Sequence, residues 1–219
     1  MTTQSSGMVQ LGSTILLHIV EPCPPNTYHT TVATEILHRK RLTTHDLSWH
    51  AHELTFSCYH GKPFLLKERV RIWLAEAVTM GLEKHSMDLW AYVIMPEHVH
   101  LVVWPRNLEY SISAFLETVK KSVARKAIRY LRTEEPEGLK HVATGQRSCP
   151  YCFWQRGGGY DRNIVSRSVL VDSVNYIHDN PVRRKLVESP TDWEWSSARQ
   201  WVSNEDGRIQ IDRISFPVT

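Results

Sequence analysis

Two histidines, His98 and His100, stand two residues apart, and the second begins a run of mostly aliphatic residues that ends at Trp104. Side chains at positions i and i+2 of a strand point to the same face, so the two imidazoles converge. Imidazole nitrogens are common metal ligands. An active metal needs at least one further ligand and an open position. The pair therefore predicts half of a metal site; the alternative is chance exposure of two among 12 histidines.

Tyr176 and Asn180 lie four residues apart in a segment with helical hydrophobic spacing, which makes them neighbours on one helix face. A phenol ionises only near about pH 10, so a tyrosine is a poor nucleophile at neutral pH unless a metal or a base assists it. A divalent ion on the histidine pair would supply that assistance. The alternatives are a core aromatic for Tyr176 and a helix-end residue for Asn180. Tyr160 is the rival nucleophile.

The elements that position these groups follow from hydrophobic periodicity. Four strands are expected, at His52 to Tyr59, Leu89 to Met95, Val99 to Trp104 and Asp161 to Val165. Three helices are expected, at Leu66 to Leu82, Ile112 to Leu131 and Ser168 to Asn180, the last ended by Pro181. Leu170, Val174 and Ile177 would pack the third helix on the sheet. The order predicts an α+β fold, a ferredoxin-like split βαβ unit with an antiparallel sheet, helices on one face and an added C-terminal helix.

Composition and length place the chain among globular proteins, because 42% of its 219 residues are hydrophobic and 22% are charged. Residues 1–48 lack sustained periodicity and predict a partly flexible N-terminal extension, whereas 201–219 predict a C-terminal tail. No stretch approaches the roughly 18 to 20 apolar residues of a membrane span. The 4 cysteines are too scattered for a disulfide framework, which favours the cytoplasm.

Three blocks resemble the REP-associated tyrosine transposases, relatives of the single-tyrosine transposases of small insertion sequences. The first, Met-Pro-Glu-His-Val-His-Leu-Val-Val from Met95, resembles their HUH motif (His, hydrophobic, His). The second is Tyr-Ile-His-Asp-Asn-Pro-Val from Tyr176, followed by Asp-Trp-Glu-Trp-Ser-Ser from Asp192. The third is Trp154-Gln155 before the strand that contains Tyr160-Asp161-Arg162. The resemblance covers about residues 50 to 200, so 49–200 is the expected transposase domain.

The resemblance implies an enzyme that cuts and rejoins single-stranded DNA near a hairpin through a 5′-phosphotyrosine. Tyr176 would be the nucleophile, and His98, His100 and Asn180 would hold Mg²⁺ or Mn²⁺, of which imidazole ligands favour manganese. Glu97 and Asp179 would support the site or face DNA, unless both are ordinary surface acids. Relatives often act as homodimers, and a cytoplasmic, nucleoid-associated location is expected. Two alternatives are a DNA-binding protein of this fold that lost catalysis and a nuclease that acts through water.

Basic residues in two segments predict a phosphate-binding surface, with a solvated helix face as the alternative. They are Lys120, Lys121, Arg125, Lys126, Arg129 and Arg132 in one helix and Arg183, Arg184 and Lys185 after the tyrosine. The run Arg156-Gly-Gly-Gly lacks the lysine of a nucleotide-binding loop. Cys149-Pro-Tyr-Cys152 resembles a glutaredoxin motif, but no helix follows it, and zinc would require a second ligand pair.

Overall fold

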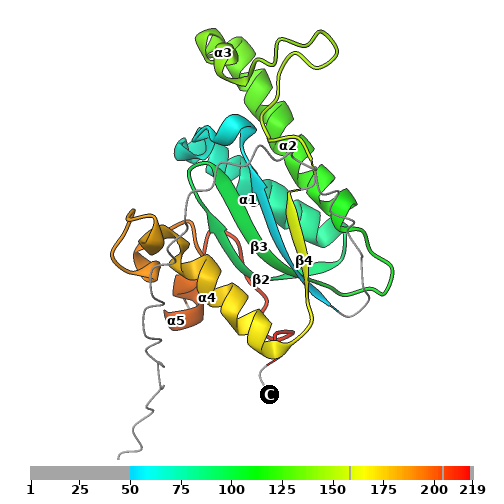
Figure 1. The fold of residues 1–219 in the computed structure, drawn as a ribbon, viewed down its shortest axis with the longest axis vertical. Helices are drawn as coiled ribbons and strands as arrows, with labels where there is room; N and C mark the ends of the chain where they lie inside the picture. Colours follow the sequence, from blue (N-terminus) through cyan, green and yellow to red (C-terminus); the bar gives the residue numbers. More distant parts are fainter. Residues whose placement is uncertain (1–49, 158, 204, 218–219) are drawn as a thin grey trace, which may run out of the picture. The chain divides into compact units, whose positions relative to one another are not determined.

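A single antiparallel sheet is the frame of the protein. The computed structural model describes residues 50–157, 159–203 and 205–217, and within them the strands pair in the order β2-β3-β1-β4 (Figure 1). Their bounds are Ala51–Ser57 (β1), Met87–Ile94 (β2), His98–Pro105 (β3) and Tyr160–Ile164 (β4). Every neighbouring pair is antiparallel. This order, with a helix after β1 and another after β3, confirms the predicted ferredoxin-like arrangement.

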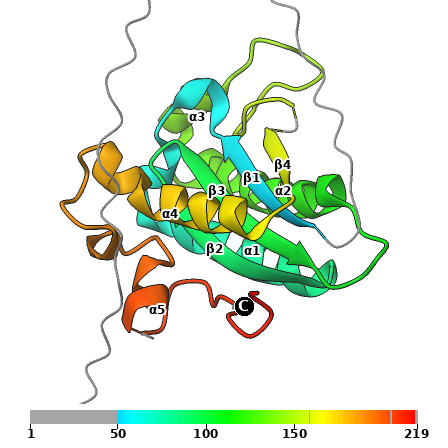
Figure 2. The ribbon, with the colours of Figure 1, turned by 60° about the horizontal axis from the view of Figure 1, so that its bottom comes forward.

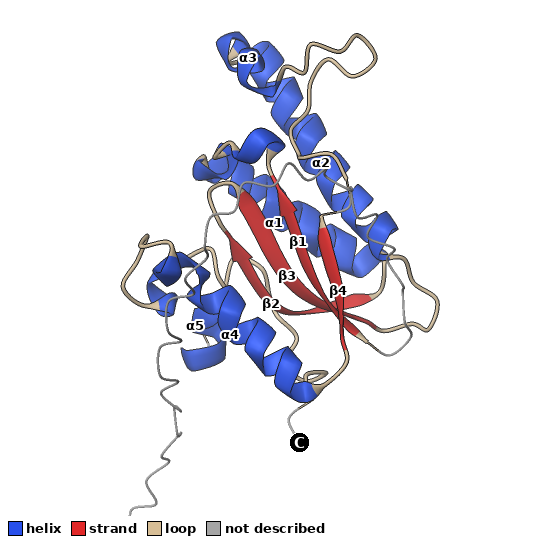
Figure 3. Ribbon diagram, in the orientation of Figure 1, coloured by secondary structure: helices blue, strands red, loops and turns tan. Residues whose placement is uncertain are grey.

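Helices cover both faces of this sheet. Helices α1 (Glu68–Lys84) and α2 (Ile112–Thr133) pack on one face, and α4 (Arg167–Arg183) crosses the other (Figure 2). The short helices are α3 (Leu139–Val142) and α5 (Ala198–Ser203), and 3-10 turns occur at Tyr59–Gly61, Phe64–Leu66, Pro136–Gly138 and Pro190–Asp192 (Figure 3). None of the helices in the described ranges is long and apolar enough to cross a membrane.

Two hydrophobic cores follow from the alternation of side chains along the strands. Val99, Leu101 and Val103 of β3 point to the α1 and α2 side and join the larger core. Val102 points to the α4 side, where it packs in a smaller core that includes Trp90 of β2. Polar side chains of β1 and β3 occupy the part of this second face that the smaller core leaves open.

The tyrosine-bearing helix does not end before Pro181, so that expectation was wrong. Pro181 lies inside α4, which continues to Arg183. Proline removes one backbone donor, but it lies in the last turn, where little helix remains to be disrupted. The extension matters because Asn180 stays within the helix and its side chain keeps the helical face that it shares with Tyr176.

The structure describes most of the C-terminal segment but not the N-terminal one. The extension predicted for residues 1–48 lies outside the described residues. The chain divides into two units, Met1–Arg39 and Lys40–Thr219, and the whole described part belongs to the second. Part of the segment predicted as a C-terminal tail packs on the domain, since Ile209 is buried and its N–H donates to the Tyr92 hydroxyl at 3.2 Å.

Truncation of a buried strand residue tests the packing. Leu101→Ala should lower the free energy of unfolding by about 2–5 kcal/mol, because a fully buried leucine leaves a cavity. Val202→Ala, at a residue that is 77% exposed, should change it by less than about 0.5 kcal/mol. Urea denaturation measures both, and equal effects of the two substitutions would contradict the assigned burial.

Candidate active site

The candidate site lies between α4 and the sheet. Leu170, Val174 and Ile177 are buried in the smaller core, which confirms the predicted apolar stripe. Ser166 caps the helix by accepting a hydrogen bond from the Val169 N–H. With the apolar stripe fixed on the sheet, the neighbouring face of α4, which carries Tyr176 and Asn180, lies over the polar part of β1 and β3.

His100 is enclosed by one residue of β1 and one of α4. It is only 5% exposed. Asn180 Nδ2 lies 3.1 Å from its Nε2, and Thr55 Oγ1 lies 2.8 Å from its Nδ1. Because an amide nitrogen only donates, Nε2 accepts from Asn180, and Nδ1 carries the hydrogen donated to Thr55. Burial, with a smaller contribution from neighbouring His98, lowers the pKa of His100 to about 3. The imidazole is therefore neutral at physiological pH and has a lone pair on Nε2.

His98 is held in the same tautomer by a different partner. Its Nδ1 lies 3.1 Å from Glu97 Oε1, and a carboxylate oxygen can only accept, so Nδ1 carries the hydrogen. Arg184 donates to the same carboxylate oxygen at 2.6 Å. Burial lowers the pKa of His98, against the opposing effect of Glu97. The two imidazole centroids are 4.8 Å apart, so the strand brings both rings together as the spacing predicts.

Tyr176 reaches the same place from the helix. Its ring meets the His100 ring edge-on, with centroids 5.8 Å apart, and the Arg183 guanidinium lies over the Tyr176 ring, 4.7 Å from its centroid. The residue is 41% exposed, which excludes the alternative of a core aromatic. Tyr176 and His100 line a surface pocket of about 610 Å³ with Glu53, Thr55, Tyr160, Arg162, Asp172 and Ser173. The rival Tyr160 thus shares the pocket.

The donors present fit a divalent ion of the predicted kind. The Nδ1–H groups point toward Glu97 and Thr55, a pattern that second partners of metal-bound histidines commonly enforce, so Nε2 is the metal-binding atom of each ring. On His100 this atom accepts from Asn180, and a cation would displace that hydrogen bond. No group of three or more His, Cys, Asp and Glu suited to a metal exists in the described part of the chain. A third protein ligand must therefore be of another type, and the Asn180 amide, in contact with His100, offers an oxygen.

Several of these pocket residues were not predicted from the sequence. Glu53 and Thr55 alternate along β1 on the face that His100 occupies, and Ser173 precedes Tyr176 by one helical turn. Alternating polar residues in β1 and the one-turn spacing of Ser173 were the available signals. Neither signal shows which strand lies beside β3. The place of these residues in the site therefore could not be inferred without the order of the strands.

The predicted basic surface is divided between the two faces of the sheet. Arg183 and Arg184 contact the site residues Tyr176 and Glu97, and Lys185 is exposed just after the end of α4. The cations of α2 lie on the other side of the sheet: Lys120, Lys121, Arg125, Lys126, Arg129 and Arg132. Two of these are paired, Lys126 with Glu76 at 2.6 Å and Lys121 with Glu117. Asp179 is exposed on α4.

His178 points away from the tyrosine, as its spacing predicts. Its Nε2 lies 2.8 Å from Ser197 Oγ, and burial lowers its pKa to about 4. Ser197 also bonds to the backbone of Tyr92 in β2. The segment Trp195-Ser196-Ser197 therefore has a structural role, because it ties the side of α4 that carries His178 to the edge strand β2.

Comparisons with known proteins agree with this geometry. No protein-family model matches the chain. A curated protein of Haemophilus influenzae, provisionally named a REP-associated tyrosine transposase, is 22% identical over 165 residues, with 68% of this chain and 89% of that protein covered. The predicted resemblance to these transposases is confirmed, and transposase is the enzyme class that the relative's name supports.

Two solved structures resemble the fold. A REP-associated tyrosine transposase bound to a REP hairpin matches with a TM-score of 0.56 and 17% identity, covering 78% of this chain and 90% of that one. At this identity the match shows the shared α+β fold. A provisionally named transposase of Deinococcus radiodurans is 19% identical over 59% of this chain and 88% of its own, with a TM-score of 0.36, too low to support an argument.

Thiol labelling tests the burial pattern around the site. Cys58, fully buried beside the β2–β3 turn, has its pKa raised to about 12 by burial, whereas Cys149 and Cys152 are partly exposed. In a Cys23→Ser background, a maleimide should label Cys149 and Cys152 in the folded protein and Cys58 only after denaturation. Mass spectrometry of peptides reads the sites, and rapid native labelling of Cys58 would contradict the packing.

Proposed function

We propose that this protein is a metal-dependent transposase that cleaves and rejoins single-stranded DNA through a phosphotyrosine at Tyr176. The observation that carries the proposal is the contact of α4 with β3. Asn180 bonds to His100, and the ring of Tyr176, one helical turn earlier, meets the same imidazole. The nucleophile and the imidazole of His100 thus line one solvent-open pocket, and His98 and Asn180 adjoin that imidazole.

A divalent cation, Mg²⁺ or Mn²⁺, completes this site. His98 and His100 would hold it through Nε2. Asn180 would turn its amide over, release the Nδ2 hydrogen bond to His100 and offer its oxygen. When bound, the cation supplies a Lewis acid for an oxygen of the scissile phosphate. Thr55 and Glu97 keep each imidazole in the tautomer that presents Nε2.

The chain's own residues account for the covalent step. The Tyr176 oxygen forms a bond to phosphorus, and the bond between phosphorus and the 3′ oxygen breaks. The 3′ oxygen takes a proton from solvent, which leaves a 5′-phosphotyrosine and a 3′-hydroxyl. Of the two carboxylates lining the pocket, Glu53 is paired with Arg162, whereas exposed Asp172 lies one turn before Tyr176. Asp172 would accept the phenol proton. Attack by another 3′-hydroxyl reverses the step without an external energy source.

Hairpin DNA is the substrate that the comparisons favour. The fold matches that of a transposase bound to a REP hairpin. Arg183 and Arg184, beside Tyr176 and Glu97, provide positive charge for its backbone. The water-using nuclease and the inactive DNA-binding protein remain the competing functions. The expected homodimer and nucleoid association stay predictions.

An adduct assay separates these functions. Incubation with labelled single-stranded hairpin DNA and Mn²⁺ should give a covalent protein–DNA species on a denaturing gel. Tyr176→Phe should abolish it, because the attacking oxygen is removed, while His98→Ala and His100→Ala should each reduce its rate at least about 100-fold through lost metal assistance. Chelation with EDTA should have the same effect.

Tyr160→Phe is the matched control, since Tyr160 lines the same pocket. It should retain the adduct. An adduct that survives Tyr176→Phe but not Tyr160→Phe would reassign the nucleophile. Cleavage without an adduct would favour the nuclease, and binding with neither would favour the inactive DNA-binding protein.

The hydrogen bond that orients His100 gives a separate prediction on metal affinity. Thr55→Val should weaken Mn²⁺ binding about 10- to 100-fold, because loss of the acceptor frees the imidazole tautomer. Thr118→Val removes a comparable bond, 2.9 Å from Thr118 Oγ1 to His85 Nε2, away from the site, and should leave affinity unchanged. Isothermal titration with Mn²⁺ measures both; equal affinities of Thr55→Val and the unaltered protein would refute the orienting role.

A further inference from the structure

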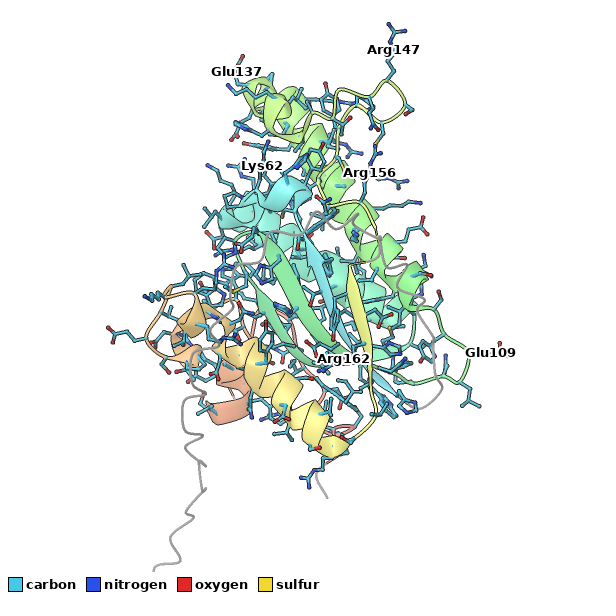
Figure 4. All side chains as sticks on the ribbon, viewed as in Figure 1. Lys62, Glu109, Glu137, Arg147, Arg156 and Arg162 are labelled. Carbon is cyan, nitrogen blue, oxygen red and sulfur yellow. The ribbon has the colours of Figure 1, made fainter. Side chains whose placement is uncertain are left out.

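Arg162 of β4 is held in the candidate pocket by a bonded cluster that joins three elements. Its NH2 donates to Glu53 Oε2 of β1 at 2.5 Å and to Ser173 Oγ of α4 at 2.8 Å. The one proton of the Ser173 hydroxyl is shared between the same carboxylate oxygen at 3.0 Å and the Val169 carbonyl at 2.8 Å. Arg162 and Glu53 are directly opposed in the β1–β4 register, and Arg162 projects from β4 on the side where α4 lies (Figure 4).

The cluster is buried at Glu53 and Ser173 and exposed to solvent at Arg162. The Glu53 side chain is 8% exposed, and Ser173 is 2% exposed, whereas the Arg162 side chain is 42% exposed. A guanidinium has five N–H donors in a rigid fork. Both bonds to the cluster come from one terminal nitrogen, so the fork is fixed in orientation while its exposed side faces solvent. A purely structural ion pair does not require this exposure.

The exposed guanidinium of Arg162 lies in the pocket where DNA must bind if Tyr176 is the nucleophile. Among the residues that line the pocket, Arg162 is the one lysine or arginine, and Tyr176 is one helical turn beyond its partner Ser173. The planar fork of arginine matches two oxygens of a phosphate. Because Glu53 already restrains the side chain, less conformational freedom is lost on binding.

We propose that Arg162 binds a backbone phosphate of the DNA strand beside Tyr176, and that Glu53 and Ser173 position its guanidinium for this contact. The proposal rests on the proposed function for the identity of the ligand. The alternative is a purely structural role, in which the cluster only holds α4 on the sheet. That role predicts that its loss lowers stability without any change in phosphate recognition.

A double variant that removes both charges of the ion pair separates the two roles. Arg162→Gln alone would leave the buried Glu53 carboxylate unpaired, so the informative variant is Glu53→Gln/Arg162→Gln, in which both side chains become amides of similar size. The matched control is Arg208→Gln. Arg208 also bonds to a glutamate, Glu194, and its side chain is 43% exposed, but it lines a different pocket, beside α1.

Binding to single-stranded hairpin DNA is measured in a Tyr176→Phe background, so that no covalent product forms. The slope of log affinity against log salt concentration should fall by about 0.7 in the double variant, as expected for one lost phosphate contact on a single strand. Arg208→Gln should leave it unchanged. Neutral methylphosphonates, placed one at a time along the strand, should weaken binding by the parent at one linkage, and the double variant should be insensitive there.

An unchanged salt slope and the same methylphosphonate profile in the double variant would overturn the proposal, as would a parent that does not bind the hairpin. Thermal unfolding of each variant shows whether it folds, and Arg162→Lys, which keeps the charge without the fork, provides a second folded protein. It should keep most of the salt slope and a reduced sensitivity at the same linkage, because its charge contacts the phosphate without the two-point geometry of the fork. Because these are binding measurements, a missing adduct in the unaltered protein would refute the transposase proposal without affecting this result.

Discussion

Helix α4 packs on the sheet face opposite α1 and α2 through Leu170, Val174 and Ile177, and the geometry of the site depends on this contact. The buried stripe fixes both the rotation of the helix and its position along the sheet. With these fixed, Asn180 meets His100 and Tyr176 stands one turn away. A rotation of α4 by one residue, about 100°, would carry both side chains away from β3. The apolar contact thus provides the precision that the polar groups need.

The polar groups beneath α4 are tolerated because each has a partner. Burying an imidazole costs free energy unless its nitrogens are hydrogen-bonded. Thr55 and Asn180 satisfy those of His100, and Glu97 satisfies one of His98. The same burial lowers the pKa of both histidines and keeps them neutral. The environment that makes the histidines costly to bury therefore also makes them suitable as metal ligands.

Local periodicity predicted much of this arrangement but not its assembly. The two-residue spacing of His98 and His100 and the four-residue spacing of Tyr176 and Asn180 are properties of one strand and one helix. Sequence could not show that these elements touch, because that contact depends on which sheet face α4 covers. For the same reason Thr55 and Arg162 were missed, and the cations of α2 were grouped with Arg183 although the sheet separates them. Pro181 was expected to end the helix because proline disrupts a helix interior, but its cost is smaller in the last turn, where it lies.

The central claim is that a cation bound by the histidine pair lies next to Tyr176, and paramagnetic broadening by Mn²⁺ tests it most directly. In protein with ¹³C-labelled tyrosine rings, one equivalent of Mn²⁺ should broaden the Tyr176 signal strongly. Tyr110, on the other face of the sheet near His52, should be affected less. The broadening of Tyr176 should disappear when both His98 and His100 are replaced by alanine. A Tyr176 signal that stays sharp, or broadening that survives the double replacement, would contradict the account.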